Sequence, residues 1–422
     1  MEQLLHYTWK HKIFPLKGLT TTTGEVLEVI DCGQANTNAG PDFFNAKINL
    51  NGVRWAGNIE IHRTSSDWFK HGHHTNPVYD SVILHIATHI DTDIYRSNGE
   101  RIPQLQLDCP NYVKDNYREL LATDSYPPCY RIIPSLSSLS IHSWMSALQF
   151  ERFQQKTEQL SERLKFCNNH WEDAFFITLA RNFGFGLNGD AFETLAKHLP
   201  LRAVDKHRND LFQVEALFFG QAGLLDEEMN DEYYIKLKKE YRYLAHKFGL
   251  TPMDALQWRF LRLRPDNFPH IRIAQLACLY HRCYGLFSQL MEKQSLKEIH
   301  DLLKGGTSEY WLTHHLFGSI SPARPKSLST SSIDLLIINT VVTFLYAYGV
   351  HKGNEQLCQR ANRFLEEVKS ENNYITRMWE KCGLKAKHAG DSQALIQLKK
   401  EYCDKKKCLY CRIGYEYLKK KQ

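Results

Sequence analysis

The sequence predicts an α+β fold, in which a mixed β-sheet module at the N-terminus is followed by a mainly α-helical domain. From residue 20 to about residue 108, apolar and polar residues alternate with the period of two that half-buried strands show. Further on, apolar residues recur at the helical spacing i, i+3, i+4 and i+7, first at Ile141, Trp144, Met145 and Leu148. The proline-rich segment Tyr126 to Ser135 between these regions is typical of a linker. We therefore expect two domains, residues 1–128 and 135–422.

Each element has its own local signal. A short helix is expected over residues 3–10, and Asn51-Gly52 is a strong hairpin signal. About five strands are expected, at 24–30, on either side of Asn51-Gly52, at 81–90 and at 102–107. Amphipathic helices are expected near 171–183, 190–199, 213–225, 229–248, 271–291, 333–349 and 354–380.

Composition limits the classes of protein to consider. A hydrophobic share of 43% over 422 residues suffices for two cores and argues against global disorder. The N-terminus has no basic leader followed by an apolar stretch, and the longest apolar run, Leu335 to Tyr348, is short for a bilayer span of roughly 20 residues. Eleven cysteines, mostly isolated, indicate reduced thiols. We expect a cytoplasmic protein with no membrane partner.

One glycine-rich motif is misleading. Gly184 to Gly189 has the G-x-G-x-x-G spacing of dinucleotide-binding loops, but that motif requires a preceding strand. Residues 171–182 have helical periodicity instead, so we expect these glycines to end one helix and begin the next.

The strongest candidate for a site is a pair of carboxylates beside the predicted hairpin. If the hairpin loop has three residues, Leu50-Asn51-Gly52, then Asp42 opposes Glu60 and the two side chains share one face of the sheet. A two-residue turn would place Asp42 opposite Ile61 and separate the carboxylates unless a bulge intervenes. Adjacent carboxylates suit Mg²⁺ or Mn²⁺. His62 would lie on the same face as Glu60, where it could bind the metal or move a proton.

This arrangement of Pro41-Asp42, a hairpin and Glu60-Ile61-His62 resembles the PD-(D/E)XK nuclease superfamily. The resemblance covers roughly residues 1–110 and implies a restriction-endonuclease-like fold with Asp42 and Glu60 as metal ligands. It also suggests Glu2 as the acid that many members carry on their first helix. His62 stands where the superfamily has a lysine, which is a departure from the pattern.

Histidines offer a second possible metal site. His71, His73, His74, His85 and His89 follow His62 closely. A transition-metal site would use His62, His73 and His85 with Asp42 or Glu60, because imidazole nitrogens suit such metals.

Cysteines form a third candidate site near the C-terminus. Cys403, Cys408 and Cys411 lie within nine residues, and Cys382 would complete four thiolates for Zn²⁺ or an iron–sulfur cluster. Residues 399–422 carry nine Lys or Arg against three Asp or Glu, which describes either a solvated basic end or a surface for nucleic acid.

Taken whole, the chain resembles an uncharacterised bacterial family, domain of unknown function 2851, over nearly its full length. The resemblance rests on residues 40–43, 60–62, 67–68, 71–73, 84–85, 218–225 and 264–269, together with the terminal cysteines. It implies no substrate. Arginines around Pro265 form a basic patch for phosphate groups, and we name Arg262, Arg264 and Arg272 as candidate substrate-binding residues.

Together these features predict a metal-dependent, nuclease-like protein that acts on nucleic acid, with Asp42, Glu60 and His62 as catalytic residues. Two alternatives stay open. One is a non-catalytic nucleic-acid-binding or assembly protein, and the other is a histidine-liganded metallohydrolase of a small substrate.

Overall fold

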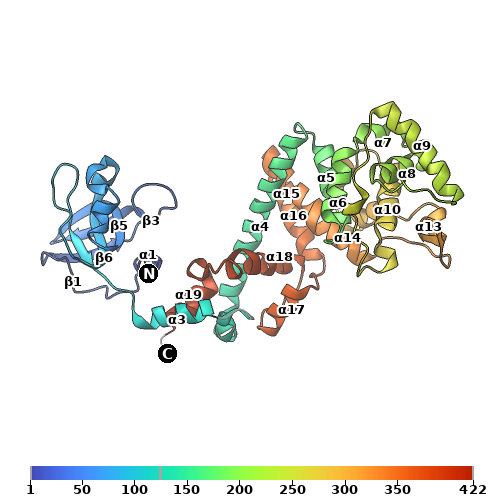
Figure 1. Cartoon of the computed structure of the whole chain (residues 1–422). Coiled ribbons are helices and arrows are strands. Elements are labelled where there is room, and N and C mark those ends of the chain that lie inside the picture. The colour runs from blue at the N-terminus through green and yellow to red at the C-terminus, as the bar shows by residue number, and fades with distance from the viewer. Residues whose placement is uncertain (1, 123–125, 421–422) are drawn as a thin grey trace. The chain divides into compact units, whose positions relative to one another are not determined.

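The chain folds into two units, each with its own hydrophobic core. The computed structural model describes residues 2–122 and 126–420 (Figure 1). Unit 1 contains Met1–Leu136 and Lys400–Gln422, and unit 2 contains Ser137–Lys399. The division at Leu136 falls next to the proline-rich segment that separates the two predicted domains.

Unit 1 is built on a mixed sheet of seven strands in the order β1-β2-β4-β5-β6-β7, with β3 paired to β4. The pairs among β1, β2, β4 and β5 are antiparallel, whereas β6 is parallel to both β5 and β7. Together with the helical unit 2, this sheet confirms the α+β class. The strands are β1 Leu19–Thr20, β2 Val26–Asp31, β3 Gln34–Ala35, β4 Phe43–Leu50, β5 Val53–Thr64, β6 Val82–His89 and β7 Gln104–Gln106.

Strand alternation gives this sheet its core. Phe43, Ile59 and Ile86 are fully or almost fully buried and pack in one cluster with Leu5 and Trp9 of the first helix. Residues at the intervening positions of β5 and β6 lie on the other face, which leaves that face for polar side chains. The helices of unit 1 are α1 Glu2–Lys10, α2 Asp67–Lys70, α3 Asn111–Ala122 and α19 Arg412–Lys419, with 3-10 turns η1 His73–Thr75, η2 Pro77–Ser81, η3 Pro128–Ser135 and η8 Cys408–Tyr410.

The hairpin between β4 and β5 has a tight turn and a bulge. Leu50 pairs with Val53, so the loop is the two residues Asn51 and Gly52, which have φ values of 49° and 87°. The three-residue loop that would bring Asp42 opposite Glu60 does not form. Instead, the register shifts by one residue between the pairs Phe43–Ile59 and Ala46–Gly57. Asn45 occupies this bulge with a φ of 56°. The shift aligns Asp42 with Glu60, whereas the tight turn alone would align Asp42 with Ile61.

Unit 2 is helical apart from a two-stranded ribbon, β8 His314–Leu316 and β9 Ser319–Ile320. Its helices are α4 Ser138–Phe166, α5 Trp171–Phe183, α6 Gly189–His198, α7 Leu201–His207, α8 Leu211–Gln221, α9 Glu232–Phe248, α10 Pro269–Arg282, α11 Leu286–Glu292, α12 Leu296–Leu303, α13 Tyr310–Thr313, α14 Thr330–Leu336, α15 Val342–Lys352, α16 Glu355–Glu367, α17 Tyr374–Lys381 and α18 Ala389–Gln397. Short 3-10 turns η4 Ala255–Gln257 and η5 Pro265–Asn267 and the π-helical turn η6 Ile337–Val341 complete the list. The π-helical turn η7 Leu398–Cys403 begins in unit 2 and ends in unit 1.

The helical spacing of apolar residues in the sequence predicted most of these helices near the positions where they form. The predicted helix over 171–183 is α5, whereas the single helix expected over 271–291 is broken into α10 and α11 because Gly285 adopts a left-handed φ of 58°. Gly184 to Gly189 lies between α5 and α6, so the structure confirms that these glycines join two helices. Thr330–Lys352 is one helical stretch long and apolar enough to span a membrane, but it is largely buried as a core helix of unit 2.

The C-terminal residues belong to unit 1, whereas the sequence assigned them to the helical domain that ends at residue 422. Helix α19 buries Ile413 and Leu418, and the buried side-chain amide of Asn116 in α3 donates to the carbonyl groups of Tyr417 and Lys420. Asn116 thus binds carbonyl groups at the end of a helix that lies roughly 300 residues further along the sequence, and such a contact leaves no local signal. Composition therefore could not predict that the C-terminal segment belongs to unit 1.

The bulge predicts a specific mutational response. Replacing Asn45 with Val should lower the free energy of unfolding by roughly 1–2 kcal/mol, because a β-branched residue is strained at positive φ. Asn45→Gly should cost much less, and Lys47→Val, on the exposed side of the same strand, serves as the control. Urea denaturation measures all three variants. Equal losses for Asn45→Gly and Asn45→Val would contradict a requirement for left-handed backbone at this position.

Candidate functional site

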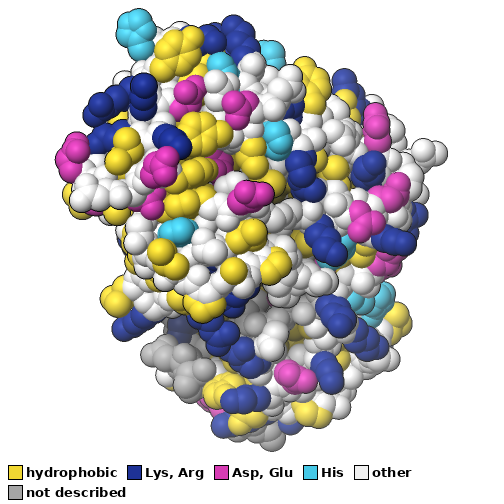
Figure 2. Space-filling model, turned by 90° about the vertical axis from the view of Figure 1, so that its right-hand side faces the viewer, with side chains coloured by type: hydrophobic (Ala, Val, Ile, Leu, Met, Phe, Trp, Pro, Cys, Tyr) yellow, Lys and Arg dark blue, Asp and Glu magenta, His cyan; other side chains and the backbone are white. Residues whose placement is uncertain are grey.

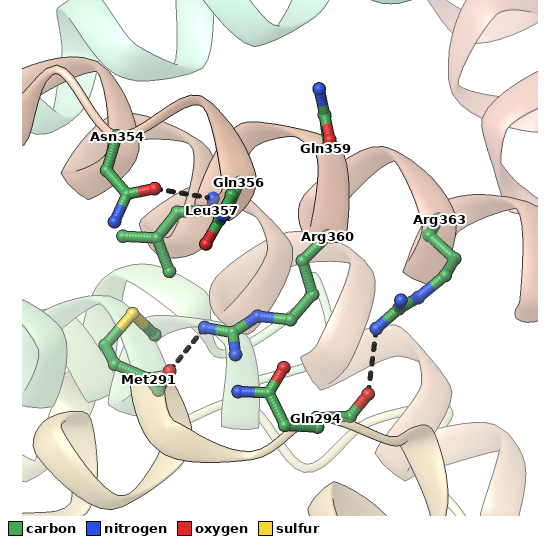
Figure 3. A pocket seen from close by; sticks show the side chains of 8 residues that line it. All are labelled: Met291, Gln294, Asn354, Gln356, Leu357, Gln359, Arg360 and Arg363. Carbon is green, nitrogen blue, oxygen red and sulfur yellow. Dashed lines mark hydrogen bonds between the residues drawn. The ribbon is translucent and has the colours of Figure 1, made fainter.

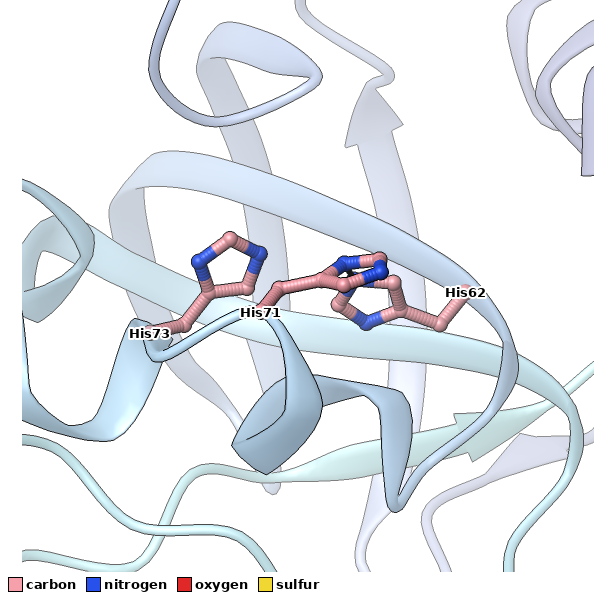
Figure 4. Close-up of side chains that lie close together, drawn as sticks. All are labelled: His62, His71 and His73. Carbon is pink, nitrogen blue, oxygen red and sulfur yellow. Dashed lines mark hydrogen bonds between the residues drawn. The ribbon is translucent and has the colours of Figure 1, made fainter.

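Three histidines of unit 1 point toward one another on the polar side of the sheet. One ring nitrogen from each of His62, His71 and His73 lies within 4.8 Å of the others (Figure 4). His62 and His73 are buried, while His71 is exposed. Nitrogens at these separations can bind one metal ion with small side-chain adjustments.

The chain places these rings through two neighbouring elements. His62 lies near the end of β5, which runs directly into α2. Gly72 then has a left-handed φ of 72°, which ends α2 and starts the 3-10 turn η1, so that His71 and His73 lie on either side of the bend. Because a Cβ at Gly72 would meet no heavy atom within 4 Å, backbone conformation rather than space requires glycine there. Both flanking rings therefore turn back toward β5.

Glu60 adds an oxygen to the three nitrogens. Its Oε1 lies 3.2 Å from Nε2 of His73 and 3.5 Å from Nε2 of His62. Nδ1 of His71 in turn lies 3.2 Å from Nε2 of His62. Glu60 thus lies against two of the three histidines, and His71 contacts His62. One oxygen with three imidazole nitrogens is a donor set that a tetrahedral or five-coordinate transition metal can take.

Asp42 lies beside this set, as the paired-carboxylate prediction required. Its backbone N–H donates to Oε2 of Glu60 at 3.1 Å, and Oδ2 of Asp42 accepts from the N–H of Ile61 at 2.9 Å. The two residues are therefore neighbours across the bulged hairpin. His6 of α1 approaches from the other side, with its Nε2 3.5 Å from Oδ2 of Asp42 and 4.0 Å from Oε1 of Glu2.

Burial sets the charge state of these groups. Desolvation raises the pKa of Glu60, and the neighbouring Asp42 carboxylate raises it further. Desolvation also raises the pKa of Asp42, while His6 opposes that shift. Burial lowers the pKa of His62 and of His73, so both imidazoles are neutral at pH 7 and keep a lone pair for a metal. A divalent cation would stabilise the ionised form of the buried Glu60 and of the half-buried Asp42, and would accept those lone pairs.

A second layer of side chains fixes the rings. His85 of β6 pairs in register with Glu60, and its Nε2 lies 2.9 Å from Nδ1 of His62. The ring of Tyr79 stacks on His73 with centroids 3.7 Å apart, and the fully buried Trp68 meets both His73 and His85 edge-on. Side chains that bind the far nitrogen of a ligand histidine orient its ring for the metal.

The structure brings Asp42, Glu60, His62 and His73 close together as the sequence predicted, and it differs from the prediction at two histidines. The predicted trio was His62, His73 and His85, but His71 takes the third place and His85 lies behind His62. His71 could have been predicted from the sequence His71-Gly72-His73, in which two histidines flank a glycine that can form a sharp turn. His6 was also missed, and its signal was weak, because only the i, i+4 spacing from Glu2 marks it.

The cysteine candidates divide between the units. Cys403, Cys408 and Cys411 belong to unit 1 and Cys382 to unit 2. Within residues 2–122 and 126–420, the group of three close metal ligands that the structure forms is the histidine group, and it contains no cysteine. A metal at the cysteines stays a prediction.

The candidate arginines lie in unit 2. Arg262 and Arg264 are exposed, whereas Arg272 is buried, donates to Gln275 and Asn267, and stacks on Phe185. These contacts give Arg272 a structural role in the fold. The face of the molecule in Figure 2 shows Lys and Arg interspersed with Asp, Glu and apolar side chains rather than in one basic field.

The geometry predicts that Zn²⁺ or Mn²⁺ stabilises the purified chain against heat. A hundred-fold excess over the dissociation constant corresponds to roughly 2–3 kcal/mol of stabilisation. His71→Ala and Glu60→Gln should remove most of the shift in melting temperature, because each deletes one ligand. His89→Ala, at the exposed end of β6, is the control and should keep it. A full shift in both ligand variants would show that the metal binds elsewhere.

Comparison with known proteins identifies a family. No curated protein and no solved structure matches the chain. The sequence model of the family described as "Protein of unknown function (DUF2851)" matches residues 2–374, which include all of the histidine and carboxylate site. The match ends before Cys382 and the terminal cysteines, so it does not test the resemblance that the sequence suggested there. The chain is a member of the DUF2851 family.

Proposed function

We propose that this protein is a metal-dependent, nuclease-like hydrolase that cleaves phosphodiester bonds in nucleic acid. The observation that carries the proposal is the convergence of three histidines, with Glu60 against His62 and His73 and with Asp42 beside Glu60. The bound metal would act as a Lewis acid on a phosphoryl oxygen and stabilise the leaving oxygen. Glu60, His62, His71 and His73 would hold it.

Asp42 and His6 have a different role in this proposal. The side chain of Asp42 is 25% exposed, compared with 6% for Glu60, so Asp42 is the carboxylate that substrate and water can reach. With its Oδ2 held by the N–H of Ile61 and faced by His6, Asp42 would orient the attacking water and accept its proton. His62, with both ring nitrogens already engaged, is better placed as a ligand than as the base that the sequence suggested.

The basic C-terminal segment supports a polyanionic substrate. Residues 400–420 fold as part of unit 1, the unit that contains the site. The ring of Tyr415 in α19 lies 4.7 Å from that of His11 and 6.4 Å from that of Tyr7, so this segment packs against the end of α1, the helix that also presents His6 to Asp42. Lys405, Lys407 and Arg412 are exposed. Clustered Lys and Arg side chains attract the phosphates of nucleic acid.

The Pro-Asp, hairpin and Glu-x-His pattern adds support from its resemblance to PD-(D/E)XK nucleases. The resemblance would make Asp42 and Glu60 ligands of Mg²⁺ or Mn²⁺ in a restriction-endonuclease-like sheet. The histidines around Glu60 favour Mn²⁺ or Zn²⁺ instead, because imidazole binds Mg²⁺ poorly.

The histidine ligands also favour a second candidate, a metallohydrolase of a small substrate. The two functions differ in what is cleaved. A polynucleotide substrate with marked salt dependence indicates the nuclease, whereas cleavage of a small phosphodiester alone, without affinity for nucleic acid, indicates the small-substrate enzyme. Metal-independent binding of nucleic acid without cleavage would indicate the non-catalytic alternative.

The test is cleavage of single- and double-stranded DNA and RNA by metal-free protein to which Mg²⁺, Mn²⁺ or Zn²⁺ is added singly. Asp42→Asn should lower the rate by about 10²-fold or more while metal still binds, because it removes the proton acceptor. Glu60→Gln and His71→Ala should lose both metal and activity. Asp67→Asn, whose carboxylate pairs with Lys70 outside the ligand set, is the matched control and should keep both.

Two results would reject the proposal. One is the absence of cleavage with every metal on every nucleic acid. The other is cleavage that Asp42→Asn and Glu60→Gln leave unchanged, which would place the activity in a contaminant or at another site.

A further inference from the structure

Unit 2 contains a polar cavity that the proposed hydrolase does not use. It is an open pocket of about 680 Å³ between the end of α11 and one face of α16. This volume lies within the range of pockets for small molecules. Figure 3 shows its lining, which includes Met291, Gln294, Gln356, Gln359, Arg360 and Arg363.

The charged side chains among the residues that line this cavity are both positive. Arg360 and Arg363 both line the cavity, and the described residues that line it include no Asp or Glu. Arg363 is partly balanced by Glu367, whose Oε1 lies 3.6 Å from Nε of Arg363. The remaining polar lining is side-chain amides, which can both donate and accept hydrogen bonds. The pocket therefore presents positive charge and neutral hydrogen-bonding groups.

Arg360 is the central feature of the pocket. It is only 7% exposed, and one Nη donates to the carbonyl of Met291. Its Nε has no hydrogen-bond partner among the described residues and is closed to solvent, so this atom does not face the open cavity, and a ligand would meet the Nη end of the guanidinium group. A guanidinium has five N–H donors in a rigid fork, and an unsatisfied buried donor is costly. Burial and the nearby Arg363 also lower the pKa of Arg360, as expected where positive charge lacks a counter-ion.

Capping of α11 explains only part of this arrangement. Arg360 and Arg363 donate to the carbonyls of Met291 and Gln294, at 2.9 Å in the second case, so both steady the chain after α11. These bonds hold the two guanidinium groups in place beside an open cavity, and they leave further donors of each group for a ligand. A rigid pair of guanidinium groups suits an oxyanion.

We propose that this cavity binds a small organic phosphate monoester, with its phosphate on Arg360 and Arg363 and its organic part against the amides. A dianionic phosphate matches two cations without a lining carboxylate. The side-chain amides of Gln294 and Gln359 each donate one N–H within the protein, to the carbonyl of Glu292 and to Glu355, and their remaining polar atoms, with the amide of Gln356, offer partners for hydroxyl or base groups. This site is independent of the proposed hydrolase, because every residue in it belongs to unit 2.

Isothermal titration of the full chain tests the proposal. The probes are inorganic phosphate, adenosine 5′-monophosphate, glucose 6-phosphate and adenosine, all titrated in EDTA so that a metal in unit 1 cannot capture phosphate. We expect saturable binding of at least one monoester, tighter than that of inorganic phosphate, and none of adenosine. The two esters distinguish a nucleotide from a sugar phosphate as the bound class.

Variants locate the binding. Arg363→Gln should weaken monoester binding about tenfold or more, because it deletes one charge-assisted contact. Arg360→Lys, which keeps the charge and loses the fork, should also weaken it. Arg377→Gln, on α17 and outside this cavity, is the control and should bind normally. No binding of either ester, equal affinity for inorganic phosphate, or binding that Arg363→Gln leaves unchanged would overturn the proposal.

Discussion

The site in unit 1 depends on the bulged pairing of β4 with β5. The tight turn at Asn51-Gly52 fixes a register in which Asp42 would be displaced by one residue from Glu60, and the bulge at Asn45 reverses this displacement. Two reciprocal hydrogen bonds then join the residues, from the Asp42 N–H to Glu60 and from the Ile61 N–H to Asp42. Bulges that re-aim side chains are common next to active sites. Here the extra residue decides whether the two carboxylates meet.

Once Glu60 is in place, the rest of the centre follows from strand and turn geometry. His62 shares the face of Glu60 through the period of two, and the parallel neighbour β6 presents His85 on that face in register with Glu60. The turn at Gly72 brings His71 and His73 back over β5. Burial raises the pKa of Glu60 to about 9, so in the metal-free protein this carboxyl group holds a proton at pH 7, and a cation that displaced the proton would meet the lone pairs of neutral imidazoles.

Much of the fold and part of the candidate site could be predicted from the sequence, because the patterns that indicate them lie within short stretches of neighbouring residues. Alternation located β2 and the strands around Asn51-Gly52, and helical spacing located α5 and α9. The adjacency of Asp42 and Glu60 was predicted only as one of two registers, since a bulge with Asn at positive φ leaves no hydrophobic signature. His6 was missed because its position depends on how α1 packs, and helix packing has no sequence period. His71 was missed as a member of the trio although two histidines flank Gly72, because strand alternation favoured His85. The return of residues 400–420 to unit 1 was likewise invisible, because it rests on contacts across most of the chain.

The most direct test of the central claim is X-ray absorption spectroscopy at the zinc edge on protein loaded with one equivalent of Zn²⁺. Glu60 and three histidines predict nitrogen and oxygen neighbours at about 2.0–2.1 Å, with the outer-shell scattering of several imidazole rings. Sulfur neighbours at about 2.3 Å would contradict this account. That result would place the metal at the C-terminal cysteines and leave the carboxylates and histidines of unit 1 without their proposed function.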